Sequence, residues 1–493
     1  MSRLIKAEIS LSATVTLLVA NRYVADASGQ WERKLVHVSP LRRSVSLEKR
    51  YERSGITLTV DDVDGEIRLL IDLAHMLFGR AVTLYVYKPN GVTLSDTITL
   101  TIRAWRREND NIVFECAQEP IGIEAPPVDE ERFINLTDFP EAAPEAVGQP
   151  VLYPAGVCYA KWGWQMAYKV INQNVGAGTN RKYLLTWSDP AGDPRILSIQ
   201  SVISNGSTVP SGDYSLTRDA NGWEYLEWNN PKLRPRCRVN LTAAVVPGTA
   251  GGNPVVALRD VLTRAGMTLV DDDDLEASFD TSGIEAIRTL TQLYSTSEYL
   301  EVWGRSFNVF WRLDSVGAVH IKRFDWGGGM WDQDANIPER SWIDFHEKAD
   351  MDIFANRIRA RYGFANGEWQ YTALHINTLA LYGASDIPVT TFPKERLEDY
   401  ELADYDTMGG DDPYARLRFF ERVRYTASGS IPLGIYESLG LGLLKTAYTD
   451  HYNQIRKSNI SINGWIYIIM EENIDWMNET VSLTLWNTQI PGP

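Results

Sequence analysis

A period-two alternation of apolar residues, repeated in short segments near both ends of the chain, most constrains the fold. In residues 4–20, apolar positions recur at every second residue from Ile5 to Leu17. Successive side chains of a strand point to opposite faces, so this pattern predicts sheets with one buried face. The alternating segments are residues 4–20, 55–62, 79–91, 96–105, 111–118, 459–473 and 479–486. We therefore expect a mainly β protein.

The N-terminal part predicts one sheet domain. Polar residues 106–111 separate two alternating segments and indicate a β-hairpin, and Pro89-Asn90-Gly91 is a strong turn signal. Residues 66–78 predict one short helix between strands. We expect residues 1–120 to fold as a β-barrel or a sandwich with one helical excursion.

Composition and apolar periodicity change several times along the rest of the chain. At roughly 150 residues per domain, 493 residues predict about three domains. Residues 121–150 are rich in Pro, Glu and Ala and predict an extended linker or arm. The other predicted units are a β domain at 151–250, a small α/β module at 251–350, and C-terminal strands with a helix and a second β-barrel at 351–493.

The predicted α/β module begins with a helix that has clear end signals. Asn253 can cap it, Pro254 fits its first turn, and Gly266 is a plausible stop. A second apolar helix is predicted over residues 298–315 and a strand over 318–324.

Composition limits the function classes. Hydrophobic residues make up 44% of the chain and charged residues 23%, as in globular proteins. The net charge of −16 argues against a protein that grips nucleic acid, because an acidic surface repels phosphates. It is compatible with a channel through which DNA slides without specific binding. The sequence offers no membrane span and no secretory signal, so we expect assembly in the cytoplasm.

The search for catalytic and metal-binding motifs is negative. None of the six histidines forms a zincin motif, and His346-Glu347 lacks the second histidine. There is no nucleophile elbow and no phosphate-binding P-loop. Cys116, Cys158 and Cys237 lie too far apart in sequence to indicate a zinc site. We therefore predict no catalytic, cofactor-binding or metal-binding residues, and no enzyme.

Two groups of residues leave alternatives open. The run Asp271–Asp274 has clustered carboxylates that a hard cation prefers, but it lacks the EF-hand spacing and the distal Glu, so a solvated, charge-rich loop after a helix is favoured over a cation site. Four tryptophans suggest either a glycan-binding platform or buried core and subunit interface: Trp162, Trp164, Trp326 and Trp331.

The order of segments resembles the tail-tip and baseplate hub proteins of long-tailed bacteriophages. The family's opening domain has a D-x-D-G turn and a G-R-x-V strand, here at residues 62–65 and 79–82. Cys158-Tyr159 departs from the family, which usually has Asn-Val there. The stretches that carry the resemblance are residues 54–87, 150–170, 196–210, 253–279, 307–324, 431–444 and 476–486.

The resemblance implies a hub of the virion's tail tip. Hubs of this family are trimers in which two barrels per chain form a six-barrel ring that continues the tail tube around the phage DNA. The implied partners are distal tail or tube proteins and tip or fibre proteins. A receptor- or glycan-binding tail protein and a tail-associated hydrolase remain alternatives.

Overall fold

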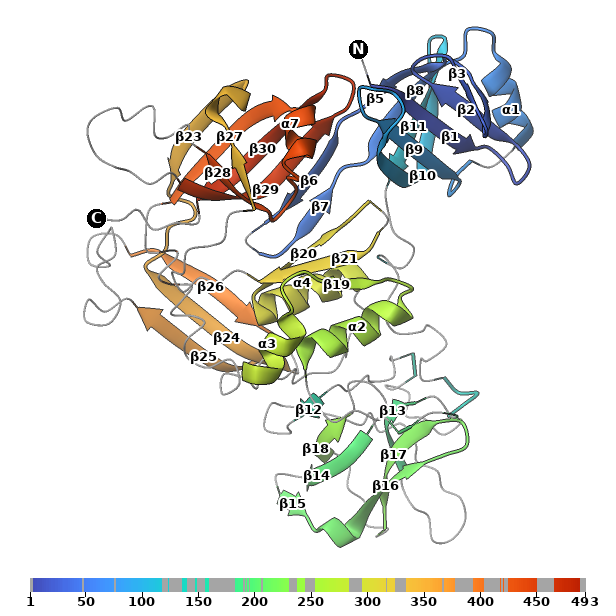
Figure 1. Ribbon diagram of the computed structural model, residues 1–493. Coiled ribbons are helices and arrows are strands. Elements are labelled where there is room, and N and C mark those ends of the chain that lie inside the picture. The colour runs from blue at the N-terminus through green and yellow to red at the C-terminus, as the bar shows by residue number, and fades with distance from the viewer. Residues whose placement is uncertain are drawn as a thin grey trace, which may run out of the picture.

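The computed structural model contains several antiparallel sheets and one compact helical region (Figure 1). It describes residues 3–117, 182–229, 253–282, 295–323, 334–376, 393–402, 424–449 and 465–487, with short gaps at 47, 75–76, 189–190, 192, 195, 205–206, 316 and 366–367, and also residues 123, 135–139, 147–148, 156–158, 237–243, 417 and 420. The prediction of a mainly β, multidomain protein is confirmed. No helix within the described ranges has the length and apolar character needed to cross a membrane.

The N-terminal module is a seven-stranded antiparallel sheet. Its strand order is β2-β1-β9-β10-β11-β8-β5, and β3 and β4 form a separate small hairpin. The predicted alternation is confirmed, since every second residue of β8 and β9 is buried. The elements are β1 Ile5–Ser10, β2 Thr16–Ala20, β3 Val24–Asp26, β4 Gly29–Trp31, β5 Leu35–Val38, β8 Ile56–Asp61, α1 Glu66–Ala74, β9 Ala81–Tyr87, β10 Leu94–Glu108 and β11 Asn111–Ala117.

The C-terminal module is a second sheet, which also contains strands from earlier in the chain. Its order is β22-β28-β29-β30-β27-β23, and β6 joins it beside β29. Residues 335–350, predicted within the α/β module, therefore supply two strands of this sheet. The elements are β6 Leu41–Val45, β7 Tyr51–Arg53, β22 Ala335–Ile337, β23 Asp344–Asp350, β27 Arg424–Pro432, α7 Leu433–Ser438, β28 Thr446–Thr449, β29 Trp465–Asp475 and β30 Thr480–Asn487.

The predicted closure of both end domains into barrels is wrong, since neither sheet closes among the described residues. In the N-terminal sheet the path ends at β2 on one side and β5 on the other, and the isolated bridge of Val19 in β2 is to Glu32, which precedes β5. The β3–β4 hairpin occupies the chain between those two edges, so no continuous ladder forms there. In the C-terminal sheet the path ends at β22 on one side and β23 on the other.

A helical region with two small sheets lies between these modules and the second β domain (Figure 1). The Asn253 side chain accepts a hydrogen bond from Val255 N and caps α2, which confirms the predicted start. The prediction of a helix over 298–315 is wrong at its C-terminal end. Asn308 adopts the left-handed conformation with φ of 57°, which ends α4, and the aromatic and β-branched residues that follow form β20. The elements are α2 Pro254–Arg264, β19 Leu269–Asp271, α3 Leu275–Ser282, α4 Thr296–Phe307, β20 Val309–Leu313, β21 Val319–Arg323, β24 Arg357–Ala365, β25 Glu368–Ile376 and β26 Glu395–Tyr400.

The second β domain contains two small sheets. Their orders are β13-β17-β16 and β12-β18-β14-β15, and all of their pairings are antiparallel. Gly222, with φ of 84°, lies in the turn between β16 and β17. Residues 205–206 and most of residues 414–424 lie outside the described part of the structure. The strands are β12 Gly156–Cys158, β13 Lys182–Trp187, β14 Ile196–Ser204, β15 Ser207–Val209, β16 Tyr214–Arg218, β17 Trp223–Trp228 and β18 Cys237–Ala243.

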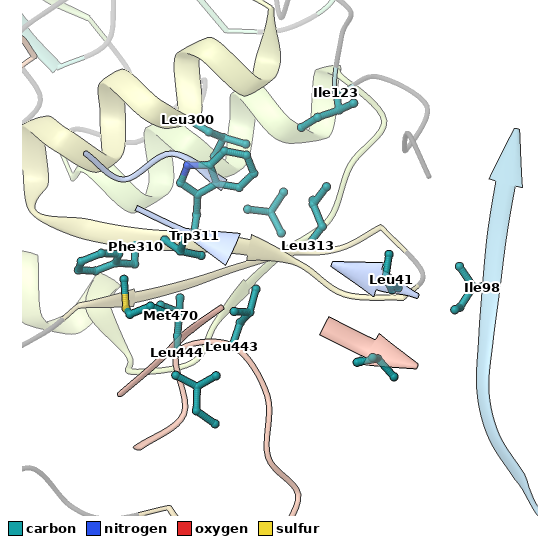
Figure 2. Close-up of a cluster of buried hydrophobic side chains, with 14 of the residues drawn as sticks. Leu41, Ile98, Ile123, Leu300, Phe310, Trp311, Leu313, Leu443, Leu444 and Met470 are labelled. Carbon is teal, nitrogen blue, oxygen red and sulfur yellow. The ribbon is translucent and has the colours of Figure 1, made fainter. Parts of the chain in front are cut away.

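One cluster of buried apolar side chains runs through three modules. It joins Leu41 of β6, Leu313 of β20 and Leu443 before β28 (Figure 2). Each of these side chains is at most 4% exposed. Because apolar burial stabilises roughly in proportion to the area removed from water, the N-terminal, helical and C-terminal modules stabilise one another.

Gly429 in β27 provides a test of the C-terminal packing. A Cβ atom there would lie 2.3 Å from the carbonyl oxygen of Asp344 and 2.8 Å from the Trp342 ring. We expect Gly429→Ala to lower the free energy of unfolding by about 1–3 kcal/mol in denaturant titrations. Gly434→Ala, in open space within α7, is the control and should change it by no more than about 1 kcal/mol. Equal effects of the two substitutions would contradict this packing.

His375 of β25 should make stability depend on pH. Burial lowers the pKa of this imidazole. The unfolded chain therefore takes up a proton below about pH 6.5 that the folded chain resists, so this stability is present above that pH and is lost as the pH falls. We expect His375→Gln to flatten the fall in unfolding free energy between about pH 7.5 and 5.5. His37→Gln, at an exposed position, is the control and should show the same dependence of the unfolding free energy on pH as the wild type.

Candidate functional site

The structural centre of the chain is a seam in which an N-terminal strand completes the C-terminal sheet. Strand β6 pairs with β29 in antiparallel register, with Leu41 opposite Ile474 and Arg43 opposite Glu472. Strand β29 has β30 along one side and, along the other, β28 for its first half and β6 for its second half. Main-chain hydrogen bonds therefore connect segments more than 400 residues apart.

A buried ion pair lies within this seam. Arg43 Nη2 is 2.5 Å from Glu472 Oε1, and the Glu472 side chain is only 1% exposed. The Tyr436 hydroxyl of α7 donates to the other carboxylate oxygen. Burial disfavours the charged guanidinium of Arg43, but the Glu472 carboxylate outweighs it and raises the pKa of Arg43. Burial and the same carboxylate raise the pKa of Tyr436.

A second buried cation connects the same two modules beside the seam. Arg3, 1% exposed, donates from Nη1 and Nη2 to the two Glu437 oxygens at 2.7 and 2.8 Å. Its main-chain N–H donates to Glu479 Oε1 at 3.0 Å, and the Ser95 hydroxyl also donates to Glu437. Bidentate arginine–carboxylate geometry fixes orientation as well as distance. The two modules are therefore held at a defined angle.

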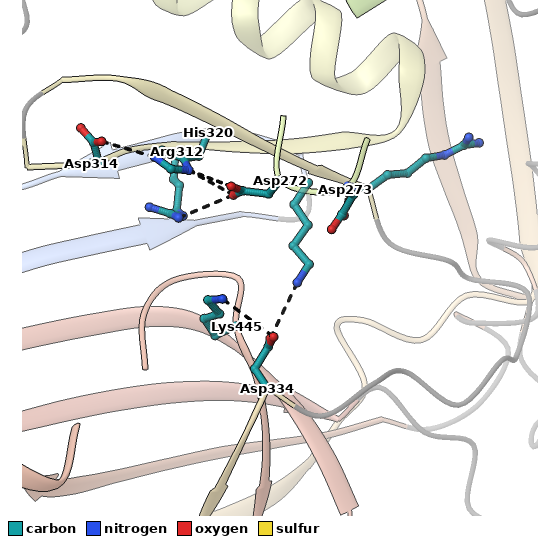
Figure 3. Close-up of polar contacts among 9 residues, drawn as sticks. Asp272, Asp273, Arg312, Asp314, His320, Asp334 and Lys445 are labelled. Atoms are coloured by element: carbon teal, nitrogen blue, oxygen red, sulfur yellow. Dashed lines mark hydrogen bonds and ion pairs between the residues drawn. The ribbon is translucent and has the colours of Figure 1, made fainter. Parts of the chain in front are cut away.

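The helical region reaches the junction through the predicted acidic run (Figure 3). Asp272 Oδ1 is 3.0 Å from His320 Nδ1, and Asp272 Oδ2 is 3.6 Å from Arg312 Nη2. His320 Nε2 lies 3.3 Å from Asp314 Oδ2. Asp334 lies 3.8 Å from both Lys322 and Lys445, so it connects this region to the C-terminal module.

The other carboxylates of the run have local partners. Asp271 accepts from the main-chain N–H groups of Leu275 and Glu276 at the start of α3. Asp273 accepts from Arg323 N at 3.2 Å, and burial raises the pKa of its carboxyl group. Among the described residues no group of three or more His, Cys, Asp or Glu side chains is arranged to hold a metal ion. The cation alternative for Asp271–Asp274 thus receives no support from this arrangement.

The remaining residues singled out from the sequence divide into two sets. Cys116 is buried, and burial raises the pKa of its thiol to about 12. The side chains of Cys158 and Cys237 and the four tryptophans Trp162, Trp164, Trp326 and Trp331 lie outside the described part of the structure.

Sequence reasoning missed Arg3, Arg43, Glu437 and Glu472. A signal was present for two of them. Arg42-Arg43 and Glu471-Glu472 are adjacent like-charged residues, positive in β6 and negative in β29, within strands that also carry apolar residues. Arginine and glutamate side chains are almost never buried without an oppositely charged partner. Two adjacent charges of one sign in a strand therefore indicated that a residue of opposite charge lies nearby in the fold. The sequence alone did not identify the partner.

The seam offers a direct comparison between a buried and an exposed ion pair on neighbouring residues. Arg43→Met leaves Glu472 buried and uncompensated, and we expect it to lower the free energy of unfolding by about 3–5 kcal/mol. Arg42→Met removes an exposed partner of Glu471 and should cost about 0–1 kcal/mol. The double variant Arg43→Met, Glu472→Met should recover most of the unfolding free energy that Arg43→Met loses. Similar losses for both single variants in denaturant titrations would contradict the assignment.

Comparison with known proteins gives structural neighbours only. No protein-family model and no curated protein sequence matches the chain. It is similar to the 43 kDa tail protein of prophage MuSo2 from Shewanella oneidensis, with 8% identity, coverage of 98% of this chain and 96% of that chain, and a TM-score of 0.42. A tail protein from Neisseria meningitidis MC58 is 6% identical, with coverage of 99% of this chain and 96% of that chain and a TM-score of 0.40. Prophage tail protein gp18 from Listeria monocytogenes EGD-e is 8% identical, with coverage of 98% of this chain and 94% of that chain and a TM-score of 0.38. Each of the three is described as a tail protein.

Proposed function

We propose that this chain is a structural hub of a bacteriophage tail tip or baseplate. In this role it continues the tail tube, surrounds a channel for DNA and anchors tip proteins or fibres. The observation that carries the proposal is the β6–β29 seam with its buried Arg43–Glu472 pair. Through it one chain presents two sheet modules side by side in a fixed orientation, as a ring of alternating N- and C-terminal modules requires.

Exposed apolar residues at the two ends of this paired unit support ring formation. On α1, Ile67 and Ile71 face the core, while Leu69 and Leu73 are 62% and 68% exposed on the other face. Figure 1 places α1 on the side of the N-terminal sheet away from the C-terminal sheet. Leu69 and Leu73 are four residues apart and so share one face of the helix, and exposed apolar side chains that lie together are a feature of protein–protein contact sites.

The opposite end of the unit is the edge strand β23. It pairs with β27 on one side and ends the C-terminal sheet. Ile343, next to this strand, is 62% exposed. A contact between the α1 face of one copy and the β23 edge of the next joins different surfaces head to tail, which closes into a ring when the rotation permits.

The chemistry at the junction supports a structural role over a catalytic one. Its charged residues pair with each other and hold modules together: Arg3 with Glu437, Arg43 with Glu472, and Asp272 with His320. The net charge of −16 supports a lumen along which DNA moves without adhering. We propose that the protein resides in the virion and is assembled in the host cytoplasm.

The oligomeric state of the purified chain tests the proposal. We expect sedimentation velocity to give a particle of three times the 55.6 kDa chain mass, and electron microscopy to show a ring with a central opening. Leu73→Glu and Ile343→Glu place a charge in the proposed contact and should each dissociate the ring. Leu374→Glu, at a 45% exposed position in β25, is the control and should not. A wild-type chain that stays monomeric at high concentration would contradict the hub.

A further inference from the structure

A cavity of about 220 Å³ lies where the N-terminal, helical and C-terminal modules meet. Arg43 of β6, Arg312 of β20 and Lys445 before β28 line it, and so does Glu472 of β29. The rest of the lining comes from Leu313, Tyr436 and the loop of residues 440–443. We infer that this cavity binds a small tetrahedral oxyanion of the phosphate type. The inference does not depend on the proposed role in a phage tail.

The charge of the lining favours an anion. Three cations face one carboxylate, and Glu472 is already neutralised by Arg43 and by the Tyr436 hydroxyl. Arg312 is 3.6 Å from Asp272 and Lys445 is 3.8 Å from Asp334, both beyond hydrogen-bond length. The aspartates that pair with Arg312 and Lys445, Asp272 and Asp334, do not line the cavity, so the surface that a ligand would contact carries three cations and one carboxylate.

One buried nitrogen in the lining has no acceptor. Arg43 Nη2 contacts Glu472, but Arg43 Nε is buried and has no hydrogen-bond partner among the described residues. An unsatisfied buried donor destabilises the folded state, and a charged one does so more strongly. A ligand oxygen in the cavity would remove that destabilisation.

The loop before β28 also has main-chain N–H groups that lack an acceptor. Leu441 N donates to Tyr436 O and Leu444 N donates to Ile469 O, whereas the amides of Gly442 and Leu443 have no acceptor within the described part of the chain. The loop is shaped by two left-handed residues, Gly440 with φ of 62° and Leu444 with φ of 64°. Successive amides in such a turn form anion-binding concavities.

The size of the cavity limits the ligand. Pockets for organic ligands usually measure about 300–1,000 Å³, and a liquid water occupies about 30 Å³. A cavity of about 220 Å³ therefore holds an oxyanion with a few waters and excludes a duplex or a folded partner. Lys445, 44% exposed, marks the side that is open to solvent. A bound oxyanion there would connect all three modules.

Calorimetric titration with inorganic phosphate, at constant ionic strength against chloride, tests the inference. We expect one site per chain and a rise in melting temperature of about 2 °C or more at saturation. Sulfate should compete, because it shares the geometry and charge. Arg312→Gln and Lys445→Gln should each weaken binding about 10-fold, as loss of a charge-assisted hydrogen bond implies.

Lys348→Gln provides the matched control. Lys348 lies on β23 of the same sheet, is 76% exposed and has an aspartate 3.9 Å away, but it does not line the cavity. The Lys348→Gln variant should bind phosphate with the same affinity as the wild type. Equilibrium dialysis of wild-type protein with labelled phosphate is independent of any variant. Absence of binding there, equal binding by all three variants, or binding of an acidic peptide in preference to phosphate would each overturn the inference.

Discussion

The pairing of β6 with β29 is the constraint on which the rest of this structure depends. It places a strand from the first fifty residues in a sheet whose other long strands all come from residues after 334. Without it the N- and C-terminal modules would share no strand. With it, the apolar cluster extends from Leu41 into the helical region at Leu313 and reaches Leu443. The seam and this cluster join the three modules through main-chain pairing and shared apolar burial.

The buried charges at the seam specify its register. A shift of one residue would move every side chain of β6 to the opposite face of the sheet. Arg43 would then lose Glu472 while that carboxylate stayed buried. Buried pairs contribute little net stability compared with apolar residues, but breaking one is costly. We therefore regard Arg43 and Glu472 as residues that select one arrangement, while the surrounding apolar contacts supply most of the stability.

Local signals in the sequence predicted the elements, and nonlocal contacts decided the features that were missed. Alternation identified the strands, and Asn253 marked the start of α2, because both signals lie within a few residues. The predicted barrels did not close, since closure depends on edges that no local pattern describes. The helix at α4 was overextended because the apolar run continues past Asn308 into β20. The Arg3–Glu437 contact spans 434 residues, so a single sequence gave no means of pairing them.

Hydrogen–deuterium exchange of the seam tests the central claim most directly. If β6 is an integral strand of the C-terminal sheet, its amides at residues 41–44 should exchange as slowly as those of β29 at 471–474 and should be released in the same unfolding event. Arg43→Met should then accelerate exchange on both strands together. Rapid exchange of residues 41–44 while 471–474 remain protected would show that the two sheets are separate, and the account would fail.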